Sequence, residues 1–195
     1  MKNLFFILLI FSMCFSCNFP AKKNTSSFLS EPDIIERLKS QKVKIDTLLY
    51  HNECQRIGYI QLSENDLPIQ IDSDFVDEYY TEFVVYKDSL GKILCVSEIP
   101  YSRSGDWFLV QNHYFDIEGK TFAFTKYFNS FCINGVGYET MTEFYNADFQ
   151  EINKEYSLVD EQNNSISKDS CFDYDFEYTV FPNVDKFMNF NNIQQ

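Results

Sequence analysis

Large apolar side chains alternate with polar ones along most of the chain from Arg56 onward, and this repeat of two constrains the fold more than any other feature. Successive side chains of extended backbone point to opposite sides, so the repeat predicts β-strands that each turn one side toward a core. The high content of Phe and Tyr suits such strands, because large rings pack well across a pleated surface. Eight segments carry the pattern and are predicted as strands: Arg56–Leu62, Tyr79–Tyr86, Ile93–Ile99, Trp107–Phe115, Thr121–Phe128, Tyr138–Tyr145, Gln150–Val159 and Phe172–Phe181.

The last of these segments shows the most regular alternation. Aromatic residues at 172, 174, 176 and 178 alternate with acidic residues or threonine at 173, 175, 177 and 179. The pattern predicts a strand with one aromatic side facing the core and one acidic side facing water. A register shift of one residue would bury three carboxylates, so we expect its register to be strongly specified.

Short turns separate the predicted strands. Asp88–Gly91 and Asp116–Gly119 are predicted as four-residue hairpin turns, because each ends in a glycine that adopts positive φ without steric cost, and Asp160–Asn164 offers a third, looser turn. Sequential strands joined by short turns favour an antiparallel β-meander. The sequence therefore predicts a mainly β (α+β) fold of about eight strands, either an open curved sheet or a small closed barrel.

A short motif accompanies two of these turns. Tyr-x-Asp-x-x-Gly-Lys occurs at Tyr86–Lys92 and again at Tyr114–Lys120. This pair resembles the hairpin repeats of MORN-like bacterial surface proteins. The resemblance covers two hairpins and implies a β-meander without implying a function.

A helix is predicted before the first strand. Ser30 is a good N-cap, Asp33 can complete a capping box, and an apolar stripe follows at positions 34, 35 and 38. We expect this helix to end near Gln41, because Val43–Ile45 alternates like a short strand.

The first 17 residues carry the signs of export. Lys2 precedes an apolar run from Leu4 to Phe15 that is too short to span a bilayer, and Ser16 and Cys17 follow it. The stretch resembles the signal of a bacterial lipoprotein with the relaxed lipobox of Bacteroidota-type bacteria. The resemblance implies cleavage before Cys17 and attachment of lipid to that residue. The alternative is an ordinary secretory signal cut near Ala21.

This interpretation predicts the domain organisation and the location. Residues 1–16 form the signal peptide, 17–29 carry the lipidated cysteine and a flexible tether, and 30–195 form a single β-rich domain. The resemblance implies an exported protein held in the bacterial envelope by the lipid on Cys17. Acidic residues do not follow Cys17 directly, which favours an outer-membrane anchor facing the periplasm. The net charge of −13 repels phosphates, so nucleic acid is not an expected partner.

The cysteines support an oxidising compartment. Of six cysteines, Cys14 leaves with the signal and Cys17 takes the lipid. The even set that remains makes two disulfides an expectation, with three pairings left open; the alternative is that some are free buried thiols. These four residues are Cys54, Cys95, Cys132 and Cys171.

Three further positions are predicted as modification sites. Thr47, Ser89 and Ser170 each follow an aspartate and precede a hydrophobic residue. This pattern resembles that of O-glycosylation in exported Bacteroidota proteins, and each residue falls beside a predicted turn or at the end of an element. The alternative is that Ser89 is merely a turn residue.

No metal site is predicted. The best group of acidic residues is the loop cluster of Asp72, Asp74 and Asp77, which together with Glu78 could turn its oxygens inward around a calcium ion. It lacks the glycine and the ligand spacing of a calcium-hand loop, so a solvated acidic surface is the default interpretation. We expect no cofactor.

The sequence predicts a protein that is not an enzyme. His51 and His113 are the only histidines, and no G-x-S-x-G nucleophile elbow is present. The favoured function is that of a lipid-anchored envelope protein whose β-domain binds or scaffolds an envelope partner. The alternative is a carrier that holds an apolar molecule, such as a lipid, inside a β-cup or barrel.

Overall fold

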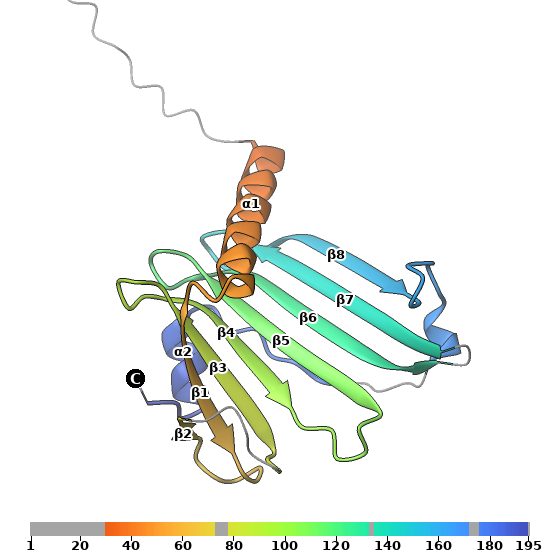
Figure 1. The fold of residues 1–195 in the computed structure, drawn as a ribbon. Helices are drawn as coiled ribbons and strands as arrows, with labels where there is room; N and C mark the ends of the chain where they lie inside the picture. The colour runs from red at the N-terminus through yellow and green to blue at the C-terminus, as the bar shows by residue number, and fades with distance from the viewer. Residues whose placement is uncertain (1–29, 73–77, 133–134, 172–175, 195) are drawn as a thin grey trace, which may run out of the picture.

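The protein forms one open antiparallel sheet of eight strands with a helix near each end of the described chain (Figure 1). The structure is a computed structural model and describes residues 30–72, 78–132, 135–171 and 176–194. The order across the sheet is β2-β1-β3-β4-β5-β6-β7-β8. The elements are α1 (Glu31–Tyr50), β1 (Gln55–Gln61), β2 (Ile69–Ile71), β3 (Thr81–Lys87), β4 (Ile93–Pro100), β5 (Trp107–Phe115), β6 (Thr121–Cys132), β7 (Gly135–Tyr145), β8 (Glu151–Val159), a 3-10 turn (Lys168–Ser170) and α2 (Val184–Phe190). The prediction of a mainly β meander is confirmed, and the sheet is open.

The predicted hairpin turns share one hydrogen-bonding arrangement. In Asp88–Gly91 and Asp116–Gly119, as in the third predicted turn at Asp160–Asn164, the aspartate Oδ1 accepts the backbone N–H groups two and four residues later, at 2.8–2.9 Å. Gly91 and Gly119 hold the turns closed with φ of 80° and 78°. The strand register shifts by one residue beside each turn. Asn146 makes the same pair of bonds in the turn between β7 and β8, where Phe149 takes the positive φ. One local arrangement thus forms three of the hairpin connections of the meander, β3–β4, β5–β6 and β7–β8.

Helix α1 is longer than predicted, and the short strand expected at Val43–Ile45 is wrong. The predicted start is correct, since the Asp33 carboxylate accepts both the backbone N–H and the hydroxyl of Ser30, at 3.3 and 2.6 Å. The helix continues to Tyr50 because Ile45 and Leu49 extend its apolar stripe onto the sheet. Burial of that stripe outweighs the modest preference of β-branched residues for strands.

Polar contacts also fix α1 on the sheet. Asp46 accepts a hydrogen bond from the hydroxyl of Tyr114 on β5 at 2.8 Å and pairs with Lys42 at 2.8 Å. The Lys42 Nζ lies 4.8 Å from the centre of the Tyr114 ring. These contacts set the position of the helix along β5 as well as its face.

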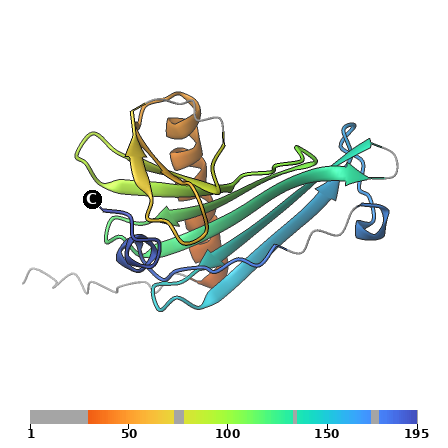
Figure 2. The same ribbon diagram turned by 90° about the horizontal axis from the view of Figure 1, so that it is seen from below.

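The predicted strand Phe172–Phe181 is wrong over the part that the structure describes, while Phe172 and Tyr174 lie outside the described residues. Residues 176–181, which we call the C-terminal strap, run across the face of the sheet opposite α1 without joining it (Figure 2). On neighbouring positions of β6, Ala123 faces α1 and Phe124 stacks on Tyr178 of the strap, with ring centres 5.1 Å apart. The aromatic alternation therefore does mark one buried side, as predicted.

Side chains replace the missing strand ladder of the strap. The Phe181 N–H donates to Nε2 of His113 at 3.3 Å, and the Phe181 carbonyl accepts the hydroxyl of Thr121. The Thr121 N–H donates to the carbonyl of Pro182 at 3.0 Å. Because these bonds satisfy backbone groups that a strand would pair, the strap stays extended while lying across the sheet.

Two short elements were not predicted. Strand β2 holds only three residues and pairs with the outer edge of β1, where Ile71 packs against Gly58. Helix α2 buries Phe187 completely against Phe83 and Phe181. Both are too short to show a periodic pattern in the sequence. Among the described residues, none of the helices combines the length and the apolar character that crossing a bilayer requires.

Candidate functional site

One of the two expected disulfides forms. Cys132 at the end of β6 is bonded to Cys171, which follows the 3-10 turn. Cys54 and Cys95 are free thiols, and Cys95 is fully buried under α1. Burial raises the pKa of the Cys95 thiol, so it stays protonated and behaves as a small apolar core residue. The four cysteines thus divide into one bonded pair and two free thiols.

The predicted lipid and metal positions are only partly covered by the structure. Cys17, Asp74 and Asp77 lie outside the described residues. Asp72 is exposed just after β2. In the described part of the chain, no group of three or more His, Cys, Asp or Glu side chains could hold a metal ion.

The predicted modification sites differ in their surroundings. Ser89 is exposed in the turn between β3 and β4. Thr47 is exposed in the last turn of α1, where its hydroxyl donates to the Val43 carbonyl at 2.8 Å. Ser170 is half-buried beside the disulfide and donates to the Ser167 carbonyl. Ser89 therefore has the most accessible hydroxyl of the three.

The two histidines do not form a catalytic arrangement. His51 is exposed at the C-cap of α1. His113 is completely buried among the rings of Phe115, Phe124 and Phe187, and burial lowers its pKa to about 4. His113 is therefore neutral at physiological pH and serves as the acceptor for the strap.

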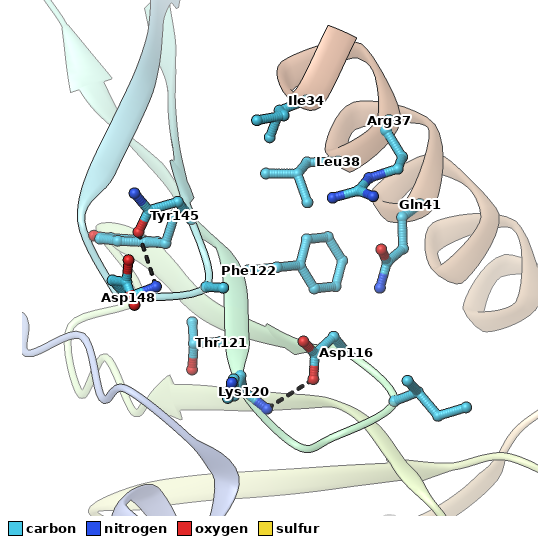
Figure 3. A pocket seen from close by; sticks show the side chains of 13 residues that line it. Ile34, Arg37, Leu38, Gln41, Asp116, Lys120, Thr121, Phe122, Tyr145 and Asp148 are labelled. Atoms are coloured by element: carbon cyan, nitrogen blue, oxygen red, sulfur yellow. Dashed lines mark hydrogen bonds between the residues drawn. The ribbon is translucent and has the colours of Figure 1, made fainter. Parts of the chain in front are cut away.

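The larger of two notable openings lies beside α1 (Figure 3). This α1 groove, of about 640 Å³, runs between the first half of α1 and the two turns at 116–119 and 146–149. Leu38 of α1 and Phe122 of β6 point into it, and both are nearly buried. Arg37 and Gln41 stand on its helical side (Figure 3).

Three of the polar residues at the α1 groove, Asp116, Asn146 and Lys120, already have partners. Asp116 and Asn146 accept the amides of their own turns through Oδ1. Lys120 pairs with Glu118 at 3.1 Å. The apolar floor packs α1 onto the sheet, so this groove is largely a consequence of how the fold is held together.

A second opening lies where β4 and β5 separate. The two strands are paired from Cys95↔Tyr114 to Glu98↔Gln111, although β4 continues to Pro100 and β5 begins at Trp107. The space between the unpaired ends, which we call the β4–β5 cavity, measures about 450 Å³. Its lining brings together Tyr79, Tyr80, Thr81, Glu98, Pro100, Tyr101, Arg103, Trp107, Leu109, Gln111, Phe176 and Glu177.

Aromatic rings form much of this lining. The rings of Tyr79 and Tyr101 are 5.0 Å apart at one side, and those of Trp107 and Phe176 are 4.6 Å apart at another. The four rings come from the loop before β3, the loop after β4, the start of β5 and the C-terminal strap. Trp107 is the only tryptophan in the chain.

Glu98 is the unusual group in the β4–β5 cavity. Burial raises the pKa of its carboxyl to about 7, and no other cause contributes. Within the described residues, its carboxylate makes no hydrogen bond and no ion pair. Its neighbour across the strand pair, Gln111, is buried, and Arg103 is exposed. The cavity thus holds a poorly solvated acid that forms no ion pair with any described residue.

The sequence analysis did not single out Glu98 or the rings around it. The one available signal is the alternation in β4, which puts Glu98 on the same side as Val96, a fully buried residue. No local sequence pattern marks Glu98 as the residue where the pairing between β4 and β5 ends.

Comparisons with known proteins give no further guide to the site. No family model, curated protein or solved structure matches the chain.

Proposed function

We propose that this protein is a lipid-anchored protein of the bacterial cell envelope whose β-domain binds a partner molecule and catalyses no reaction. The anchor is the lipid on Cys17, reached through the tether of residues 17–29. Helix α1 begins directly after that tether, at Glu31. The domain would thus hang from the membrane by the N-terminal end of α1, at the outer membrane and facing the periplasm.

The observation that carries the proposal is the Cys132–Cys171 disulfide. Structural disulfides persist in oxidising compartments and are rare in the cytosol, where thiols are kept reduced. The bond closes the end of β6 onto the segment that leads to the strap. Together with the proposed export signal in residues 1–17, the disulfide supports a location outside the cytoplasm.

A binding role is supported better than a catalytic one. Nucleophilic catalysis needs a base within hydrogen-bonding reach of a nucleophile. Within the described residues, Nε2 of His113 is occupied by the Phe181 N–H in a buried setting, and His51 is exposed at a helix end. The β4–β5 cavity offers a surface for binding instead.

The carrier hypothesis receives less support. A lipid carrier needs a hollow apolar interior. Here the space between sheet and α1 is filled by Leu38, Ile45 and Phe144, and the space under the strap is filled by aromatic rings such as Phe124 and Tyr178. We therefore assign the binding role to the β4–β5 cavity.

Replacement of Cys17 by alanine tests the anchor. Labelled palmitate should be incorporated into the wild-type protein and should not be incorporated into Cys17→Ala. The variant should also be recovered in the soluble fraction without detergent. Cys14→Ala is the matched control, because it removes a neighbouring thiol within the apolar run and should still be labelled. Equal labelling of wild type and Cys17→Ala, or no labelling of either, would refute the anchor.

A further inference from the structure

We propose that the β4–β5 cavity binds a small organic cation, an alkylammonium or trimethylammonium group, between the Glu98 carboxylate and the surrounding aromatic rings. The inference rests on the proposed binding role and names the chemical class of the ligand.

The cavity exists because the sheet itself opens. Backbone pairing between β4 and β5 ends at Glu98↔Gln111, and the strands leave space between Pro100 and Trp107. A volume of about 450 Å³ lies within the roughly 300–1,000 Å³ typical of small-molecule sites. The site is therefore preformed, and a ligand can enter without separating paired strands.

The charge at the cavity points to a cation. Glu98 is poorly solvated and has no counter-charge among the described residues, and Glu177 of the strap adds a second carboxylate at the lining. Among the described residues that line the cavity, Arg103 is the one cation, and it is exposed to solvent and forms no ion pair with Glu98. A cationic ligand would supply the opposite charge that the Glu98 carboxylate lacks.

The rings decide which kind of cation fits. The faces of Tyr and Trp attract cations within about 6 Å of the ring centre, and aromatic cages of this type recognise quaternary ammonium groups. Tyr79, Tyr101, Trp107 and Phe176 line the same space as Glu98 and are the rings that could supply such contacts. Calcium prefers six or more oxygen ligands with several carboxylates among them, whereas this lining holds two carboxylates, and no group of three or more His, Cys, Asp or Glu side chains among the described residues could hold a metal ion. The combination therefore favours an organic cation.

A second buried carboxylate shows what a structural role looks like. Glu143 of β7 accepts hydrogen bonds from Tyr145 and Tyr178 and pairs with Lys154 at 2.7 Å. Burial alone would raise the pKa of Glu143, but these contacts outweigh it and hold the pKa below the usual value. Glu98 lies on the same face of the sheet, and among the described residues it has no comparable partner.

Trp107 makes the test direct, because the only tryptophan of the chain lines the cavity. The full chain, purified in a non-ionic detergent, is titrated with choline at about pH 8, where Glu98 is ionised. We expect a saturable change in Trp107 fluorescence. The neutral analogue 3,3-dimethyl-1-butanol and equal concentrations of sodium chloride should not produce it. A choline response no larger than that of the neutral analogue would overturn the proposal.

Three variants locate the cation. Glu98→Gln should weaken choline binding about tenfold or more, whereas Glu151→Gln, a remote exposed carboxylate, should leave it unchanged. Tyr101→Leu, measured by calorimetry, should weaken choline binding more than binding of the neutral analogue, and this variant decides the matter if Glu98→Gln does not fold. Arg103→Ala should bind choline at least as well as wild type, because the variant removes a like charge; weaker choline binding would overturn the proposal.

Glycerophosphocholine distinguishes the two sources of a trimethylammonium group. If glycerophosphocholine binds more tightly than choline and Arg103→Ala removes this difference, the ligand is a lipid head group. If glycerophosphocholine binds equally or more weakly, the ligand is a free cation. Failure of choline to bind, with palmitate still entering through Cys17, would remove this inference and leave the proposed anchor standing. If a chain that incorporates no palmitate still binds choline, the proposed anchor is refuted and the cation site stands.

Discussion

The α1 groove and the β4–β5 cavity differ in what their polar groups are doing. The α1 groove is the larger, yet Asp116 and Asn146 are bonded to their own turns and Lys120 to Glu118. The β4–β5 cavity is smaller, and Glu98 inside it has no partner among the described residues. Volume therefore does not separate a structural hollow from a binding site here. A polar group without a partner does separate them. Such a group lowers the stability of the folded protein, so a site that retains one is better explained by binding than by packing.

The largest expected effect concerns the floor of the α1 groove. Phe122→Ala removes a ring that is 4% exposed and packs α1 on the sheet, so the free energy of unfolding should fall by about 3–5 kcal/mol. Tyr101→Leu, at the half-buried lining of the β4–β5 cavity, should cost less than about 1 kcal/mol. Denaturant unfolding measures both. Equal losses would contradict the division into a structural groove and a binding cavity.

The next largest effect is an increase in stability rather than a loss. Glu98→Gln should raise the free energy of unfolding by about 1–3 kcal/mol near pH 8. The folded protein holds this carboxyl at a pKa of about 7, above the usual 4.5, so the folded state loses stability as pH rises between these values. The gain from the variant should vanish below about pH 4.5, where both states are protonated. A destabilised Glu98→Gln at pH 8 would show that the carboxylate has a structural partner.

The smallest effect tests whether Asp116 belongs to a turn or to a ligand site. Asp116→Ala and Asp88→Ala remove the same pair of turn hydrogen bonds, but only Asp116 lines the α1 groove. Each should cost about 1–2 kcal/mol of unfolding free energy, with equal choline responses of Trp107. If Asp116→Ala alone abolished ligand binding, the α1 groove would be the functional site.

Much of the fold could be predicted because it follows from local rules. The hairpin turns at Asp88 and Asp116 depend on residues within five positions, and the capping of α1 depends on Ser30 and Asp33. The strap shows where such rules stop. Its alternation correctly indicates one buried side, but its hydrogen-bond partners His113 and Thr121 are about sixty residues away in the chain. Alternation alone cannot distinguish a paired strand from an extended segment crossing a sheet.

The candidate site could not be predicted from the sequence for a similar reason. The rings of Tyr79, Tyr101, Trp107 and Phe176 come from four separate segments, and they meet because β4 and β5 stop pairing at Glu98. The disulfide was anticipated only as one of several pairings. Which thiols bond is decided by the end of β6 meeting the segment after the 3-10 turn.

The most direct test of this account is a carbon-13 NMR titration of the Glu98 carboxyl, with Glu98→Gln used to assign its signal. The account predicts a titration midpoint near pH 7 in the free protein. Saturating choline should move that midpoint down toward the usual 4.5, because a nearby positive charge favours the ionised form. A midpoint near 4.5 in the free protein, or one near 7 that choline does not move, would contradict it.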